Sequence, residues 1–286
     1  MSAVPVPLSV GVGPPTNGIP VFLYHAVSDD APGWLAPFTV SPRTLVEHLD
    51  MIAGSGLNVV PLRQLVAALL GGPPVPPRSA VLTFDDGYAD FASTVAPLLA
   101  ARGLPATLYV TTGALRAAAR RSGGGPFPSA ATLSWAQVRE LDAAGVEIGG
   151  HSMTHPQLDT LPRKSVREEV TGCKREIEDA LGHPVVSFAY PHGYSSRAVR
   201  AQVREAGWTS AAAIRAASAF SSHRDDPLRF ARLMVRADTG RERFALWTSG
   251  EGAPVAPFAE GPRTRGWRAY RRARAAIGRP YRAIPA

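Results

Sequence analysis

The chain has 286 residues, a formal net charge of +8 and a hydrophobic fraction of 45%. This composition is that of an ordinary folded protein, and a single cysteine excludes a disulfide framework. The length allows one large α/β domain or two small ones.

Residues 1–18 are rich in Pro, Gly and Val, and they predict a flexible N-terminal lead. They lack the basic start and the sustained apolar run of a signal peptide. No later stretch has the length and apolar character of a transmembrane helix. The expected location is therefore the cytoplasm, with peripheral attachment at the inner membrane face as a further option.

Residues 19–250 alternate between short apolar runs and helical patterns. Residues 19–24 predict a buried strand, and Ser41-Pro42 predicts the start of a helix, on whose surface His48 is expected. Further strands are expected at residues 57–60, 79–84, 106–111, 146–150, 185–190, 210–214 and 230–235. Further helices are expected at residues 62–70, 88–102, 135–144, 162–181, 195–206, 241–247 and 267–277. Residues 112–133 predict a long loop.

Residues 251–286 predict a Pro/Arg-rich basic tail, because the stretch Arg263–Arg282 holds many arginines and no acidic residue. One interpretation is a solvated tail. Another is peripheral contact with an anionic membrane surface or polymer. Nucleic-acid binding is not expected, because the rest of the chain carries no recognised nucleic-acid motif.

Polar residues follow four of the predicted strands directly. They are His25, the pair Asp85-Asp86, His151, and the turn Pro191-His192-Gly193. About seven alternations of strand and helix predict a parallel sheet, either open or closed as a barrel. In a parallel barrel the loops after the strands share one mouth, so these side chains are expected to converge there.

Two histidines and one carboxylate are a suitable set of ligands for a divalent metal. His151 and His155 stand four residues apart, and the Asp85-Asp86 pair offers one ligand and one free carboxylate that can act as a base on water. Taken alone, Asp-Asp-Gly is more typical of a helix N-cap and His-x-x-x-His occurs by chance. Their joint placement after strands favours a metal site.

These residues resemble a known family. Thr83-Phe84-Asp85-Asp86-Gly87, His151-Ser152-x-x-His155 and Phe188-Ala189-Tyr190-Pro191-His192-Gly193 are similar to three signature motifs of the polysaccharide deacetylases, carbohydrate esterase family 4. The resemblance covers residues 19–246. It implies a distorted (β/α)7-type barrel in a single catalytic domain, residues 19–250, and metal-dependent removal of N-acetyl groups from amino sugars.

The resemblance also implies roles for individual residues. Asp86, His151 and His155 would bind Zn²⁺ or another divalent metal such as Co²⁺, Ni²⁺ or Mn²⁺. Asp85 would be the general base, and the backbone N–H of His192 would hold the oxyanion. Tyr190, Pro191 and Trp135 are the expected substrate contacts.

The chain departs from the family pattern at three places. The final motif, Leu-x-His, is missing at the C-terminal end, but Leu23-Tyr24-His25 has its pattern, as in the circularly permuted subset similar to poly-N-acetylglucosamine deacetylases. His25 is therefore the expected general acid, with a structural histidine as the alternative. The usual arginine that orients the catalytic aspartate is replaced by Ala189, and Arg232 is the candidate substitute. The fourth motif is not recognisable.

The expected function is removal of an N-acetyl group from an amino sugar or N-acetylated glycan. One alternative is an amidohydrolase that acts on a non-sugar linear or cyclic amide. Another is a catalytically inactive carbohydrate-binding domain, which the replacement at Ala189 would favour. The oligomeric state is left open.

Overall fold

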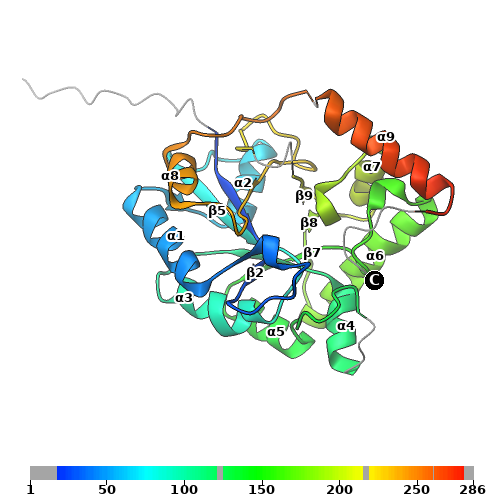
Figure 1. The fold of residues 1–286 in the computed structure, drawn as a ribbon, viewed down its shortest axis with the longest axis horizontal. Helices are drawn as coiled ribbons and strands as arrows, with labels where there is room; N and C mark the ends of the chain where they lie inside the picture. Colours follow the sequence, from blue (N-terminus) through cyan, green and yellow to red (C-terminus); the bar gives the residue numbers. More distant parts are fainter. Residues whose placement is uncertain (1–17, 121–124, 215–218, 260, 280–286) are drawn as a thin grey trace, which may run out of the picture.

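The strands of the central sheet run parallel and curve towards a barrel (Figure 1). The protein is described by a computed structural model over residues 18–120, 125–214, 219–259 and 261–279. Apart from Gly18, the predicted lead at residues 1–18 lies outside these ranges, and so does the end of the predicted tail. No helix in the described ranges is long and apolar enough to cross a membrane.

The sheet has the strand order β10-β1-β5-β6-β7-β8-β9. Its strands are β1 (Val21–Tyr24), β5 (Ser79–Phe84), β6 (Thr107–Val110), β7 (Glu147–Gly150), β8 (Ser187–Ala189), β9 (Ser210–Ala212) and β10 (Leu233–Met234), and β4 (Asn58–Val59) pairs with β5. A parallel bridge between Ala212 and Phe230 joins β9 to the segment that leads into β10. Since β10 pairs with β1, the sheet forms the expected distorted (β/α)7-type barrel.

Helices surround this barrel (Figure 1). They are α1 (Pro42–Gly54), α2 (Leu62–Leu69), α3 (Ala96–Ala100), α4 (Thr112–Arg120), α5 (Trp135–Ala143), α6 (Arg163–Leu181), α7 (Arg197–Glu205), α8 (Arg241–Ser249) and α9 (Pro262–Ala276). Ser41 caps α1 by accepting a hydrogen bond from the backbone N–H of Thr44. Ser134 forms a reciprocal capping box with Gln137 at the start of α5. The Ser41-Pro42 signal in the sequence thus marks the start of α1 correctly.

The strands that carry the polar clusters are buried. All six residues of β5 and all four of β1 are buried, as is typical of parallel strands covered on both faces. The polar residues of interest begin at the first position after these strands, where the chain leaves the core. This rigid attachment fixes the direction in which each loop starts.

Three expectations about elements are wrong. Residues 112–120 form helix α4 instead of a loop, because alanine, leucine and arginine there have high helix propensity. The predicted helix 88–102 is interrupted: a π-helical turn, Phe91–Val95, precedes α3. His48 is buried, and its ring stacks on Phe244 of α8 with centroids 3.8 Å apart.

Part of the predicted basic tail packs onto the barrel as helix α9. Arg271 on this helix is fully buried and binds both carboxylate oxygens of Asp159, at 2.8 Å each. Asp159 belongs to the short helix Leu158–Thr160, and α9 lies beside α7 in Figure 1. A solvated tail is therefore wrong for residues 262–276, while the domain boundary at residue 250 stays a prediction.

Candidate active site

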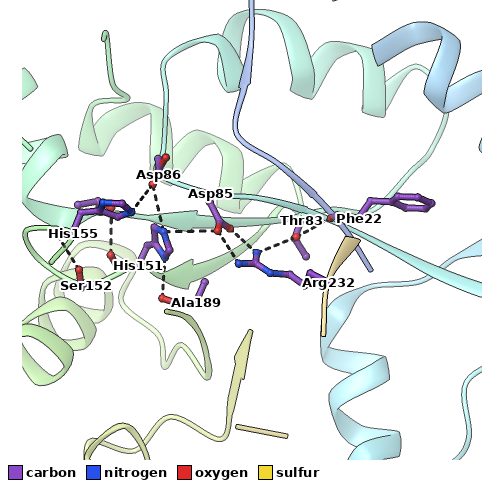
Figure 2. Close-up of polar contacts among 10 residues, drawn as sticks. Phe22, Thr83, Asp85, Asp86, His151, Ser152, His155, Ala189 and Arg232 are labelled. Atoms are coloured by element: carbon purple, nitrogen blue, oxygen red, sulfur yellow. Dashed lines mark hydrogen bonds and ion pairs between the residues drawn. The ribbon is translucent and has the colours of Figure 1, made fainter. Parts of the chain in front are cut away.

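Asp86, His151 and His155 converge at the mouth of the barrel (Figure 2). Asp86 Oδ1 lies 3.4 Å from His151 Nε2 and 3.3 Å from His155 Nε2. Two ligands bound tetrahedrally at about 2.0–2.1 Å from one zinc ion are separated by about 3.4 Å. The three side chains predicted as metal ligands therefore have the spacing of a metal site.

The loops that carry these candidate ligands have an unusual backbone. Asp86, Ser152 and His155 adopt left-handed conformations, with φ values of 76°, 65° and 59°. Such conformations cost free energy for residues other than glycine and persist where the surroundings enforce them. The backbone N–H of His155 donates a hydrogen bond to Ser152 Oγ at 3.0 Å, which holds this tight turn. The turn brings His155 back towards His151.

Hydrogen bonding leaves one ring nitrogen of His151 free to act as a ligand. Its Nδ1 lies 2.8 Å from the carbonyl oxygen of Ala189, which can only accept, so Nδ1 carries the proton. Nε2 is then left with a lone pair that faces Asp86. Asp86 Oδ1 is buried and has no hydrogen-bond partner among the described residues. A buried acceptor without a donor fits a bound cation, and the N, N, O donor set suits zinc and similar divalent ions.

The local electrostatics keep the carboxylate of Asp86 ionised. Burial alone would raise the pKa of Asp86, but His155 and His151 outweigh it and hold this pKa well below its usual range. Burial also lowers the pKa of His155, although Asp86 opposes this shift. An ionised carboxylate beside a neutral imidazole is the protonation state that metal binding requires.

Asp85 lies between this triad and Arg232 and contacts both His151 and Arg232 (Figure 2). Arg232 Nη1 and Nη2 donate to the two oxygens of Asp85 at 2.7 and 2.8 Å, and both side chains are buried. Arg232 Nη1 also lies 3.3 Å from Thr83 Oγ1, which donates to the carbonyl oxygen of Phe22 at 2.8 Å. Asp85 Oδ2 lies 3.7 Å from His151 Nε2. The carboxylate is thus held in one orientation beside the candidate metal site.

A cavity of about 770 Å³ opens over these residues. His25 and His192 line it together with Asp85 and Asp86. Burial lowers the pKa of His25, against the opposing effect of Asp86 and Asp85, and lowers that of His192 to about 4. His192 has a left-handed backbone with φ 58°, and its ring lies 4.5 Å from that of His155. The sequence therefore identified polar residues that share one cavity.

The expected substrate contacts are placed elsewhere. Tyr190 is fully buried, and its hydroxyl donates to the carbonyl oxygen of Leu228 at 2.8 Å. Pro191 is buried as well, and Trp135 packs at the edge of the hydrophobic core. None of the three is among the described residues that line the cavity. These contacts were assigned from neighbouring motifs, which do not reveal the direction of a side chain.

Sequence reasoning missed two members of an aromatic wall of the cavity, Tyr194 and Trp267, which line it together with Trp34. Trp267 Nε1 donates to the hydroxyl of Tyr194 at 2.9 Å. The guanidinium of Arg271 lies 3.6 Å from the centre of the Tyr194 ring. Tyr194 directly follows the third motif, but Trp267 and Arg271 come from α9. No local signal marks a basic C-terminal segment as a part of the cavity.

The comparison with protein families matches residues 72–211 to the polysaccharide deacetylase model. Among curated proteins, the putative polysaccharide deacetylase YxkH of Bacillus subtilis is 21% identical over 184 residues, 64% of this chain and 60% of that protein. Poly-beta-1,6-N-acetyl-D-glucosamine N-deacetylase of Escherichia coli is 31% identical over 144 residues, 48% of this chain and 21% of that protein. The chain therefore spans less than two thirds of either relative.

Among solved structures, the deacetylase PplD of Streptococcus pyogenes, in complex with acetate, superposes with a TM-score of 0.70. The superposition covers 82% of this chain and 99% of that chain at 22% sequence identity. At this identity the likeness establishes the fold. It agrees with the barrel topology described above.

Proposed function

This chain carries a polysaccharide deacetylase domain, and from that premise we propose that it removes an N-acetyl group from an amino sugar or N-acetylated glycan by metal-dependent hydrolysis. The observation that carries the proposal is the arrangement of Asp86, His151 and His155 around one point, with Asp85 held beside them by Arg232. An inactive carbohydrate-binding domain would not need a buried carboxylate ordered in this way. The name of the Escherichia coli relative supports an N-acetylated sugar polymer as the substrate class.

Asp86, His151 and His155 would hold the metal, with zinc, cobalt, nickel and manganese as candidates. The metal would supply Lewis-acid polarisation of the acetyl carbonyl and lower the pKa of the attacking water. Asp85 takes the proton from that water, and Arg232 keeps the carboxylate oriented towards it. The backbone N–H of His192 donates to the developing oxyanion, and His25 delivers a proton to the departing nitrogen.

The test is acetate release from N-acetylglucosamine oligosaccharides, measured together with metal content. We expect Asp85→Asn to lower kcat by about 10²–10⁴-fold, the usual contribution of general-base catalysis. The metal content should stay that of the wild type, because the three ligands are unchanged. Asp29→Asn, at an exposed aspartate, is the matched control and should keep wild-type activity. An unchanged rate in Asp85→Asn would refute the proposed role of Asp85.

A non-sugar amide remains the alternative substrate, and the same assay addresses it. A glycan substrate would be supported if the oligosaccharides release acetate and a matched set of N-acetylated amines without a sugar ring does not. The reverse preference would support the amidohydrolase alternative. Loss of activity in His155→Ala together with loss of bound metal would link the two properties, since His155 is one of the three proposed ligands.

A further inference from the structure

A second, open groove of about 1010 Å³ lies between α9, α7 and the start of α6. Among the described residues, seven arginines line its walls: Arg163, Arg197, Arg200, Arg229, Arg265, Arg268 and Arg272. Among the described residues that line it, Asp159 is the only acidic one, and both of its carboxylate oxygens are bound by Arg271. The groove therefore has a strong excess of positive charge.

Two of these arginines are available for a ligand. Arg197 and Arg265 are exposed and have no acidic partner within ion-pair distance in the described part of the chain. The charges of two others are only partly neutralised. Arg200 lies 3.6 Å from Asp226, and Arg163 lies 3.4 Å from Glu205, whose side chain is half exposed. Guanidinium groups gathered with so few acids repel one another, and an anionic ligand relieves this repulsion.

The groove adjoins the active-site cavity. Arg229, Phe258 and Arg268 line both spaces, so that one ligand can extend from the arginines to the proposed metal site. Arg236 and Arg263 add positive charge to the cavity side. The arrangement joins a site for N-acetyl chemistry to a site for anions.

We propose that the groove binds a phosphoryl group of the substrate, so that the protein deacetylates an amino sugar that carries a phosphate or diphosphate. This proposal deepens the proposed function and rests on it. Arginine pairs with phosphate through two parallel hydrogen bonds, and several arginines match the multiple charges of a phosphate or diphosphate. A single carboxylate of an acidic glycan carries one negative charge, against the two positive charges of Arg197 and Arg265.

The first test measures binding and does not depend on activity. Inorganic phosphate is titrated into the purified full-length protein by calorimetry. We expect the double variant Arg197→Gln/Arg265→Gln to weaken phosphate binding by about tenfold or more, because two charge-assisted contacts are lost. Arg139→Gln/Arg243→Gln, which removes two exposed arginines from α5 and α8, carries the same change in net charge and should bind phosphate as the wild type does.

The second test compares three substrates by acetate release. They are a neutral methyl glycoside of N-acetylglucosamine, N-acetylglucosamine 1-phosphate, and a polyprenyl diphosphate-linked N-acetylglucosamine in detergent micelles. We expect kcat/KM for a phosphorylated substrate to exceed that for the neutral one by about tenfold or more, and this advantage to shrink in Arg197→Gln/Arg265→Gln. A preference for the micellar substrate indicates a lipid source of the phosphoryl group, and a preference for the 1-phosphate indicates a soluble source.

Several results would overturn the proposal. One is equal phosphate affinity in Arg197→Gln/Arg265→Gln and the wild type. Another is an equal loss of phosphate affinity in the α5/α8 control. A third is a preference for a glucuronate-containing N-acetylated disaccharide over the phosphorylated sugars. The variant Arg197→Lys/Arg265→Lys keeps the charge and should retain part of the phosphate binding, which guards against a folding artefact. Failure to release acetate from any substrate would refute the proposed function, while the calorimetry would still decide whether the groove binds phosphate.

Discussion

Asp85 and Arg232 form a buried bidentate ion pair between residues that lie far apart in the sequence. The usual arginine of the third motif is absent, since Ala189 stands there, yet a guanidinium binds both oxygens of Asp85. Arg232 comes from the segment before β10, 147 residues away from Asp85. Because both groups are buried, neither is stable in the protein without the other.

We expect Arg232→Gln to lower kcat strongly while leaving KM largely unchanged, because Asp85 loses its orientation but the cavity wall is intact. The same variant should lose about 3–5 kcal/mol of unfolding free energy, since an unpaired carboxylate stays buried. Arg232→Lys keeps the charge without the bidentate geometry, so its kcat and its unfolding free energy should lie between those of the wild type and of Arg232→Gln. Steady-state kinetics and urea unfolding measure both effects, and Arg243→Gln, at an exposed arginine, is the control. Wild-type kcat in Arg232→Gln would contradict the positioning role.

At the scale of the residue, the sequence correctly predicted the location of side chains that directly follow a strand. Asp85, Asp86 and His151 come directly after buried runs, so that their location at the barrel mouth follows from the fold. Tyr190 has the same kind of position, after β8, but its side chain turns into the core and bonds Leu228. Sequence position sets where a residue leaves a strand, whereas packing sets which way its side chain points.

At the scale of the element, β7 positions His151 through two glycines. A Cβ added to Gly149 would lie 2.6 Å from the ring of Tyr109, and one added to Gly150 would lie 2.5 Å from Trp208. Cβ atoms essentially never approach other heavy atoms this closely. Glycines are therefore required at these two positions so that β7 can pack between its neighbours and place His151 beside Asp86.

We expect Gly150→Ala to destabilise the protein by about 1–3 kcal/mol, the usual cost of overpacking a core. Because Trp208 is fully buried and cannot move freely, the end of β7 should shift, and metal affinity should fall with it. Gly54→Ala is the matched control: nothing lies within 4 Å of its Cβ position, and it belongs to helix α1. Thermal unfolding and metal titration measure the two effects. Equal behaviour of the two variants would contradict this account of β7.

The packing that the sequence missed depends on a long-range partner. A helix was expected at residues 267–277, but as part of a basic tail, whereas Arg271 of α9 is buried against Asp159, 112 residues earlier in the chain. No pattern within residues 262–276 reveals this partner. Helix α4 was hidden for another reason, because the glycines that follow it suggested a loop over the whole segment.

At the scale of the molecule, the first and the last strand of the domain meet side by side in the sheet. Strand β1 pairs with β5 on one side and with β10 on the other, so that His25 at the N-terminal end lies beside the last strand. The proposed role of His25 requires this neighbourhood, because it places the Leu23-Tyr24-His25 pattern at the start of the chain beside the last strand of the sheet. His48 reinforces the same junction: its Nδ1 lies 3.1 Å from the hydroxyl of Tyr24 in β1, and its ring stacks on Phe244 of α8.

His48 should make this junction sensitive to acid. Burial lowers the pKa of His48 to about 4, against the opposing effect of Glu47, while the histidine of the unfolded chain titrates near 6.5. Between these values the unfolded state binds a proton that the folded state does not, so stability falls as the pH drops from about 6.5 to about 4. This difference in the pKa of His48 corresponds to about 3 kcal/mol of unfolding free energy, and the protein keeps all of it above pH 6.5.

We therefore expect the unfolding free energy of the wild type to fall by about 3 kcal/mol more than that of His48→Gln between pH 7 and pH 4. Glutamine can still bond the hydroxyl of Tyr24 but does not titrate, so that the comparison isolates the charge. At pH 7 the variant should be the less stable protein, because the stacking on Phe244 is lost. Urea unfolding at a series of pH values measures the difference. Parallel pH profiles for the two proteins would show that protonation of His48 does not limit the acid stability of the junction between β1 and α8.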